Sequence, residues 1–314
     1  MKKAIFFAFL FFIFFNLEVN PAQAYLLNGV DLLGQIDLNG NPTFDTRDVN
    51  NPYTNQLSGA VLNKLGGIEF DFVHHRLFVA DRYNNRVLIF NLSEDNQLED
   101  IVADYVLCQN DFSSNTSGLS QSQCEKPRYV AYDSNHDYLF VSDQANYRVL
   151  VFDLSNGITN GMNATYVLGQ DNFESEEYTD EDNSPPTANR FVNTPYDILY
   201  DKSRDYLYVS DINGNRVLVF DLSNGITNGM NASFVLGQDD FTSKTENLNQ
   251  MGTVFPNGLA LDSVNQRLFV VNGEGANRVM VFDVSEIANG EPAINVIGQP
   301  DFITGTTGTD ENSL

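Results

Sequence analysis

The sequence predicts an all-β protein built from repeated four-stranded sheets, and three observations support this. The stretch FDLSNGITNGMNATYVLGQDNF at 152–173 recurs at 220–241 as FDLSNGITNGMNASFVLGQDDF, with 19 of 22 positions identical. Both copies belong to a longer unit that occurs four times, with an arginine opening its third apolar run at 86, 148, 216 and 278. Each unit holds four short runs rich in Val, Ile, Leu, Phe and Tyr, bounded by Asp, Asn, Gly and Ser, which is typical of β-strands joined by tight turns.

The second unit shows the expected strands most clearly. They are YVAY (129–132), YLFVS (138–142), RVLVFD (148–153) and TYVLGQ (165–170). One such sheet cannot bury both of its faces alone, so it must stack on its neighbours. The repeat therefore predicts a β-propeller with blades at about 66–112, 128–173, 195–241 and 257–302.

The third strand and the turn before it carry a resemblance to a known family. The segment DINGNRVLVFD (211–221) resembles the NHL repeat, and the resemblance extends over about residues 65–302. It implies a propeller, commonly with six blades, in a family whose members bind protein, bind RNA or act as enzymes. The resemblance therefore specifies the fold much more closely than the function.

Both ends of the repeat region look incomplete. LLGQ (32–35) resembles an outer strand with no inner strands before it, and 303–314 reads as an inter-blade connection or tail. We expect four full NHL-like repeats plus this N-terminal outer strand to form part of a five- or six-bladed ring, and the printed chain to be a fragment.

The N-terminus has the features of a secretory signal over residues 1–24. Two lysines precede the apolar run Ala4 to Phe15, and Ala22-Gln23-Ala24 offers small residues for cleavage. The run is shorter than the roughly 20 residues that span a bilayer, although an uncleaved anchor stays an alternative. We expect a secreted, extracellular or periplasmic protein whose mature chain does not insert into the membrane.

The net charge of −25 excludes some classes of partner. With 42 acidic and 17 basic residues, the chain repels nucleic acid and anionic lipid. We expect a protein, peptide or glycan partner that the sequence does not identify. No cofactor is expected beyond a weakly bound divalent cation such as Ca²⁺.

The two cysteines, Cys108 and Cys124, predict a disulfide if the protein is exported. The closed loop of about 15 residues would contribute about 3 kcal/mol in the chain-entropy model. Two separate buried thiols are the alternative. Because Cys108 stands in a position that is glycine in the other units, the bond would staple one connection between blades.

Acid–arginine pairs recur at the turn between the second and third strands, and we interpret them as structural braces. The pairs are Asp81 with Arg86, Asp143 with Arg148, and Asp211 with Arg216. In the fourth unit Asn272 replaces the aspartate. The glutamine that ends each fourth strand, such as Gln170, is expected to hydrogen-bond a neighbouring blade.

Differences between the repeats locate a candidate binding surface, because structural positions repeat whereas functional ones need not. The turns between blades and the turns between second and third strands should share one end of the sheets. Polar residues there would suit a polar ligand or a peptide; they are Arg82, Tyr83, Arg128, Tyr129, Gln144, Tyr196, Asp197, Asn257 and Glu274.

Two functional interpretations follow. The main one is an exported, non-catalytic binding scaffold. The alternative is a metal-dependent hydrolase or lyase of the propeller lactonase type, for which Glu69, helped by Asp197, is a weak metal-ligand candidate. The three histidines, His74, His75 and His136, fall in the turns at the opposite end of the blades, which argues against the histidine zinc site of NHL-type amidating lyases.

Overall fold

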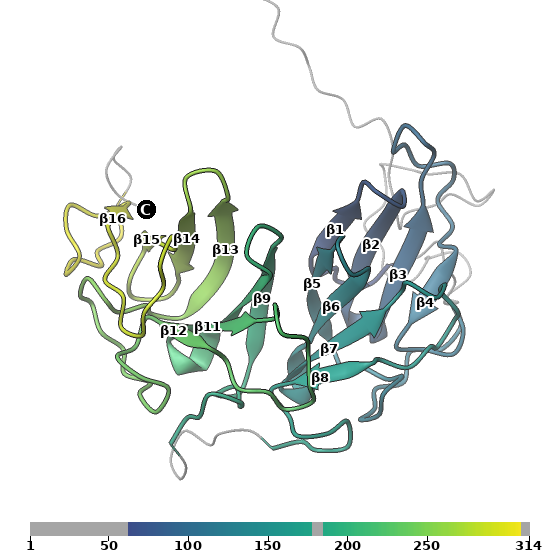
Figure 1. Ribbon diagram of the computed structural model, residues 1–314, viewed down its shortest axis with the longest axis horizontal. Helices are drawn as coiled ribbons and strands as arrows, with labels where there is room; N and C mark the ends of the chain where they lie inside the picture. The colour runs from purple at the N-terminus through teal and green to yellow at the C-terminus, as the bar shows by residue number, and fades with distance from the viewer. Residues whose placement is uncertain (1–61, 178–184, 309–314) are drawn as a thin grey trace, which may run out of the picture. The chain divides into compact units, whose positions relative to one another are not determined.

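A computed structural model describes residues 62–177 and 185–308, all within one compact unit that spans 32–314. The described part of the chain forms four antiparallel sheets of four strands each (Figure 1). The predicted signal segment, the LLGQ strand and the end of the tail lie outside the described residues.

The sheets follow one another along the chain, and we call them blades 1 to 4. Blade 1 contains β1 (Ile68–Asp71), β2 (Arg76–Asp81), β3 (Arg86–Asn91) and β4 (Tyr105–Leu107). Blade 2 contains β5 (Pro127–Asp133), β6 (Tyr138–Asp143), β7 (Arg148–Asp153) and β8 (Tyr166–Leu168). Blade 3 contains β9 (Pro195–Asp201), β10 (Tyr206–Asp211), β11 (Arg216–Asp221) and β12 (Phe234–Leu236). Blade 4 contains β13 (Pro256–Asp262), β14 (Arg267–Asn272), β15 (Arg278–Asp283) and β16 (Asn295–Ile297).

Within each blade the strands pair in sequence order, which is the arrangement of a propeller blade. The sequence-based prediction of an all-β propeller is therefore confirmed. In the first three blades a single 3-10 turn joins the second and third strands: η1 (Arg82–Asn84), η2 (Gln144–Asn146) and η3 (Ile212–Gly214). A left-handed residue ends each of these turns, with φ of 51° at Asn85, 55° at Tyr147 and 50° at Asn215. Asparagine tolerates this conformation well, which explains its recurrence before the arginine.

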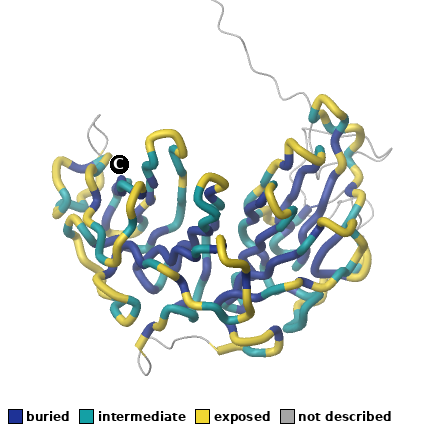
Figure 2. Tube along the Cα trace, in the orientation of Figure 1, coloured by how far each residue is buried: buried dark blue, intermediate teal, exposed yellow. Residues whose placement is uncertain are grey.

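The hydrophobic core lies between consecutive blades rather than at one centre. Phe78 and Ile89 of blade 1 pack with Leu139 and Leu150 of blade 2, and similar clusters join blades 2 and 3 and blades 3 and 4. Figure 2 shows the resulting pattern, with buried strands and exposed connecting loops. Successive side chains of a strand point to opposite faces of the sheet. Because strands such as β7 are apolar and buried along almost their whole length, both faces of an inner blade are covered.

The repeated arginines are almost completely buried and hold the blades to their connections. Arg148 donates from Nε to Asp143 at 2.8 Å, and its other nitrogens donate to the carbonyl oxygens of Phe173 at 2.6 Å, Ser120 at 2.9 Å and Gln123 at 3.0 Å. The structure thus places the acid–arginine pair inside a larger set of hydrogen bonds that reaches both loops beside the blade. This set explains why an aspartate, an arginine and a phenylalanine recur together.

The same plan holds in the other blades. Arg86 and Arg216 donate to Asp81 at 2.7 Å and Asp211 at 2.8 Å, and each also reaches a phenylalanine carbonyl. In blade 4, where Asn272 replaces the aspartate, Arg278 bonds the carbonyl oxygens of Phe302 and Gly252.

The glutamine that ends each blade has a different role from the one expected. Gln170 donates to the carbonyl of Tyr147 at 3.3 Å in its own blade and to that of Glu177 at 2.6 Å in the connection that follows. Gln238 makes the equivalent bonds to Asn215 and Thr245. The expectation of a bond to a neighbouring blade was wrong, because the outer strand ends beside the turn of its own sheet.

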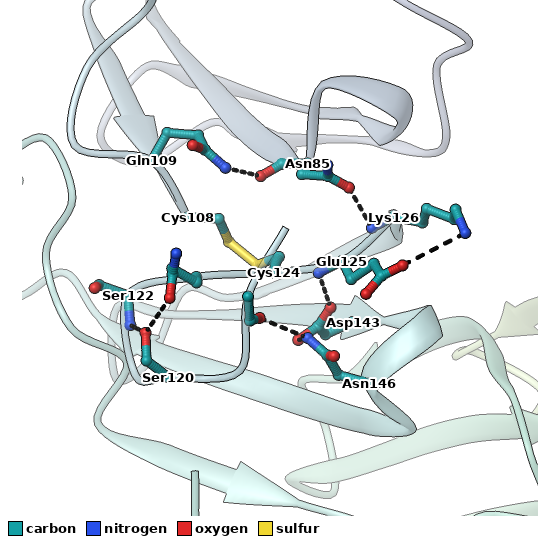
Figure 3. The surroundings of a disulfide bond; sticks show 12 residues. Asn85, Cys108, Gln109, Ser120, Ser122, Cys124, Glu125, Lys126, Asp143 and Asn146 are labelled. Atoms are coloured by element: carbon teal, nitrogen blue, oxygen red, sulfur yellow. Dashed lines mark hydrogen bonds and ion pairs between the residues drawn. A yellow bond between two sulfur atoms is a disulfide. The ribbon is translucent and has the colours of Figure 1, made fainter. Parts of the chain in front are cut away.

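The predicted disulfide is confirmed. Cys108 and Cys124 are bonded, with their Cα atoms 5.2 Å apart, and both are fully buried (Figure 3). Beside the bond, the amide N–H of Lys126 donates to Asn85 Oδ1 at 2.9 Å, and that of Glu125 donates to Asp143 at 2.6 Å. The disulfide therefore staples the connection from blade 1 to blade 2 where both blades already hydrogen-bond it.

The outer face of blade 4 differs from the equivalent face of blade 3. Val271 and Ile297 are 40% and 47% exposed, whereas their counterparts Ser210 and Leu236 are fully buried beneath blade 4. Among the described residues, no further sheet covers this face of blade 4. The number of blades in the intact ring stays a prediction.

Candidate functional site

Five of the nine candidate residues lie in the first strands of blades 2 to 4 rather than in the turns between blades, and the other four lie in the turns between second and third strands. In blade 2, Pro127 pairs with Asp143 and Val130 with Val141, so Arg128 and Tyr129 together oppose one residue of β6. This is a β-bulge, which locally re-aims side chains. The first strand therefore begins two residues earlier than predicted and carries the candidate residues on its bulge.

In blades 2 and 3, a serine on the second strand stabilises the bulge. The amide N–H of Tyr129 donates to Ser142 Oγ at 2.9 Å, and that of Asp197 donates to Ser210 Oγ at 2.8 Å. The Ser142 hydroxyl donates onward to the carbonyl of Tyr196 at 3.1 Å, which links blades 2 and 3. A hydroxyl thus replaces the ladder partner that the bulge removes.

Arginine and tyrosine side chains from two neighbouring bulges pack together. The Arg128 guanidinium lies 3.6 Å from the ring centroid of Tyr196 and 5.8 Å from that of Tyr129, and it also hydrogen-bonds the Tyr196 hydroxyl. The two tyrosine rings are 5.9 Å apart. Blades 2 and 3 therefore present one joined cationic and aromatic surface.

Blade 1 adds a second arginine and tyrosine to this surface. Arg82 donates to Gln144 Oε1 at 2.7 Å and lies 5.2 Å from the ring centroid of Tyr83. The ammonium group of Lys64 lies 4.8 Å from the same centroid. We call Arg82, Tyr83, Arg128, Tyr129 and Tyr196 the arginine–tyrosine rim.

The two rim arginines retain unused hydrogen-bonding capacity. The Nε atoms of Arg82 and Arg128 are buried and have no hydrogen-bond partner. Burial, aided by repulsion from Arg82, lowers the pKa of Arg128. Within residues 62–177 and 185–308, neither guanidinium forms a salt bridge.

A glycine pair in blade 1 lets the first two blades approach at the rim. The amide N–H of Gly67 donates to the carbonyl oxygen of Arg128 at 2.6 Å. A Cβ atom on Gly66 would lie 1.8 Å from that same oxygen, so no side chain fits there. The glycines thus set the spacing between β1 and the bulge of β5.

A cavity of about 360 Å³ lies beside the rim, between the first strands of the four blades. Glu69, Tyr129 and Asp197 line it together with apolar residues that include Val130 and Leu259. Burial raises the pKa of Glu69, and burial raises that of Asp197 to about 6 against the opposing effect of hydrogen bonds from two amides. The cavity therefore combines an apolar wall with two carboxyl groups that ionise at unusually high pH.

Asp197 also joins blade 3 to blade 4. Its carboxylate accepts the amide N–H of Leu259 at 2.7 Å and that of Ile198 at 2.9 Å. Neither Asp197 nor Glu69 belongs to a group of three or more metal-ligating side chains among the residues that the structure describes.

The blade 4 candidates are not part of the rim. Asn257 lies near the backbone of Gly273, and Glu274 is exposed in the turn after β14. No described interaction links either residue to the arginine–tyrosine rim. The inserted turn of this blade contains Gly275 with a left-handed φ of 81° in place of the 3-10 turn of the other blades.

Sequence reasoning missed Lys64, Ser142 and Ser210. Lys64 precedes the first repeat and had no counterpart to compare. The two serines interrupt otherwise apolar second strands in YLFVSD and YLYVSD, and a buried hydroxyl at that place is the signal that could have indicated the bulges.

No family model matches the chain, and no curated protein matches it. Several solved structures do, at low identity. A protein from Lactobacillus plantarum is 16% identical with a TM-score of 0.46, and the match covers 74% of this chain and 54% of that one. A chain of a nidogen/laminin complex is 17% identical with a TM-score of 0.42, covering 71% and 62%. Hydrazine synthase from Kuenenia stuttgartiensis is 12% identical with a TM-score of 0.44, covering 75% and 50%.

The chain thus spans between half and about three fifths of these structures, and similarity this distant says nothing of its function. As to the membrane, the helices of the described ranges are single 3-10 turns, and none could cross a bilayer.

Proposed function

We propose that this protein is a non-catalytic propeller scaffold of the NHL type that binds a protein or peptide through the arginine–tyrosine rim. The observation that carries the proposal is the packing of two arginines and three tyrosines from three blades on one surface. Tyrosine and arginine are the residues on which protein interfaces most often depend. A rigid sheet holds these side chains in place before the partner arrives, which lowers the entropic cost of binding.

The chemistry of the rim favours an acidic group on the partner. Arg82 and Arg128 lie close enough for their charges to interact, and neither forms a salt bridge within the described part of the chain. In a protein with a net charge of −25, this is a local concentration of positive charge. An aspartate, a glutamate or a C-terminal carboxylate could accept hydrogen bonds from both guanidinium groups.

Export is part of the proposal. The signal-like residues 1–24 and the Cys108–Cys124 disulfide both support a secreted or periplasmic protein, because disulfides persist in oxidising compartments. The rim would then meet partners outside the cytoplasm.

The alternative function is a metal-dependent hydrolase or lyase with its site in the cavity. One observation favours it, namely that Glu69 and Asp197 line the same cavity and both have raised pKa values. Two carboxyl groups are fewer ligands than catalytic metal sites commonly use, and the amides of Ile198 and Leu259 already occupy Asp197. The binding scaffold is therefore the better-supported function.

A peptide-binding experiment tests the proposal. The full chain is screened against a peptide array, and the strongest binder is measured by calorimetry against the wild type, Arg128→Gln and Arg82→Gln. We expect binders to be acidic and each variant to bind at least tenfold more weakly. Arg204→Gln, at the opposite end of blade 3, is the matched control and should bind normally.

Two results would contradict the scaffold proposal. Equal binding by wild type and both rim variants would show that the rim is not the site. Turnover of esters or lactones that chelation abolishes, and that Glu69→Gln also removes, would establish the enzyme instead. A preference for acidic glycans over peptides would change the class of partner.

A further inference from the structure

The ends of the blades opposite the rim share a second repeated plan. The first strand of each of the first three blades ends in a buried aspartate: Asp71, Asp133 and Asp201. One carboxylate oxygen accepts amide N–H groups of the following turn, for example Asn135 at 2.7 Å onto Asp133. The other oxygen is left for the junction with the next blade.

At the junction of blades 1 and 2, a built-in cation fills this place. Arg76 donates from Nε to Asp71 Oδ2 at 2.8 Å and pairs with Asp137 of blade 2. Its guanidinium also donates to the Tyr132 hydroxyl at 2.9 Å, and that hydroxyl donates to Asp137 at 2.8 Å. Two carboxylates from adjacent blades therefore share one arginine, and the tyrosine bridges that arginine and Asp137.

The junction of blades 2 and 3 keeps the acids and the tyrosine but lacks the arginine. Asp133, Asp205 and Tyr200 take the places of Asp71, Asp137 and Tyr132, and the Tyr200 hydroxyl donates to Asp205 at 2.9 Å. The strand register shows the exchange: Asp71 pairs with Arg76 in blade 1, whereas Asp133 pairs with Tyr138 in blade 2.

Both junctions have a histidine, His74 at the first and His136 at the second, but at the second no arginine of the described residues lies beside the histidine. His136 Nδ1 lies 2.6 Å from Asp133 Oδ2, and one ligand atom from each of Asp133, His136 and Asp205 lies within 4.8 Å of the other two. A cavity of about 100 Å³ adjoins them and is lined by all three and by Tyr138. The side chain of His136 is 52% exposed, so an ion can enter from solvent.

The third junction, between blades 3 and 4, lacks both the second acid and the histidine. There Gln266 takes the place of Asp205 and Arg204 the place of His136. Among the three junctions in the described part of the chain, the one between blades 2 and 3 alone combines two carboxylates and an imidazole with no arginine beside them.

We propose that Asp133, His136 and Asp205 bind a divalent cation of the Zn²⁺ class, which joins blades 2 and 3 as Arg76 joins blades 1 and 2. Imidazole with two carboxylates is a donor set that suits Zn²⁺ better than Ca²⁺, which prefers more oxygen ligands. With Zn²⁺ bond lengths of about 2.0–2.2 Å, ligand atoms that lie within 4.8 Å of one another need only small side-chain adjustments to share one ion. The cation would supply the positive charge that Arg76 supplies at the junction of blades 1 and 2, which we call the sister junction. Tyr200, bonded to Asp205, would orient that ligand.

The test is Zn²⁺ binding by the full chain at pH 7.5, measured by calorimetry after chelator treatment, with excess Mg²⁺ to saturate the acidic surface. We expect one tight site. His136→Gln and Asp205→Asn should each weaken it at least tenfold, and affinity should fall at pH 5.5 because protonated imidazole cannot ligate.

Two further variants distinguish the site from general attraction to an acidic protein. Tyr138→Arg imports the arginine of the sister junction and should abolish Zn²⁺ binding while the fold persists. His74→Gln, at the sister junction, is the matched control and should leave binding unchanged. Absence of a tight site in the wild type would overturn the proposal, as would tight binding that survives both Tyr138→Arg and His136→Gln.

Discussion

The repeated arginine offers a direct test of what holds the blades together. Replacing Arg148 with Met removes four hydrogen bonds, one to Asp143 and three to carbonyl oxygens of Phe173, Ser120 and Gln123. Both members of the ion pair are fully buried, so Asp143 would keep a charge without a counter-charge. Removing one partner of a buried pair costs about 3–5 kcal/mol.

The expected loss is a large part of the stability of a typical domain, which is about 5–15 kcal/mol. With a urea m-value of about 2–3 kcal/mol per molar, the unfolding midpoint of Arg148→Met should fall by roughly 1–2.5 M. Urea denaturation followed by circular dichroism and by tyrosine fluorescence measures this shift. Coincidence of the two curves checks that unfolding is two-state.

Two controls separate the buried pair from a general effect of losing charge. Arg267 pairs with Asp283 at 2.6 Å, but both side chains are about one third exposed, so Arg267→Met should cost less than about 1 kcal/mol. Adding Asp143→Leu to Arg148→Met should restore part of the stability, because no buried charge then remains unpaired. A loss below about 1 kcal/mol for Arg148→Met alone would refute the assignment of the arginine as a brace.

Three other predictions follow from the geometry. Cys108→Ser with Cys124→Ser should lower the free energy of unfolding by about 3 kcal/mol in urea denaturation, and an unchanged midpoint would contradict the staple. Gly66→Ala should weaken both stability and rim binding, because the new Cβ would meet the Arg128 carbonyl oxygen; normal binding in calorimetry would show that β1 can shift. Because the pKa of Asp197 is about 6, its carboxylate gains charge as pH rises through that value. Affinity for an acidic peptide should therefore fall roughly three- to tenfold between pH 5 and 7, and Asp197→Asn should remove that dependence.

The blades could be predicted from sequence because their causes are local. Strand runs, turn residues and the aspartate five positions before Arg148 all lie within one repeat, and four copies show which features recur. The Cys108–Cys124 bond was predictable for a similar reason, since it closes a single connection. For both features, the only inference needed was which neighbouring segments of one repeat or one connection lie next to each other.

The rim and the glutamine bonds depended on information that a single repeat does not contain. The bulge that carries Arg128 and Tyr129 arises from a shift in strand register, which composition does not reveal. The sequence places Gln170 at the end of an outer strand, which suggested a bond to a neighbouring blade. It does not show that the turn ending in Tyr147 brings a carbonyl of the same blade within reach. Contacts between blades, such as Arg128 on Tyr196, appear only when the sheets are placed side by side.

The proposed sites both arise where one repeat departs from its neighbours while the bracing residues stay the same. At the rim, Arg128 and Tyr129 take the places that Gly66 and Gly67 occupy in blade 1. The bulge accommodates these two residues, and Ser142 bonds the amide of Tyr129, so the rest of the strand still pairs normally. At the opposite end, Tyr138 takes the place of Arg76 and leaves two carboxylates without their cation. Because a buried aspartate–arginine pair braces each of blades 1 to 3 independently of these positions, the chain can change the chemistry at either end at little cost in stability. Function should therefore follow the residues at the ends of a blade and not its strands. Arg128→Gly combined with Tyr129→Gly, which gives blade 2 the glycines of blade 1, should lose peptide binding yet still bind Zn²⁺.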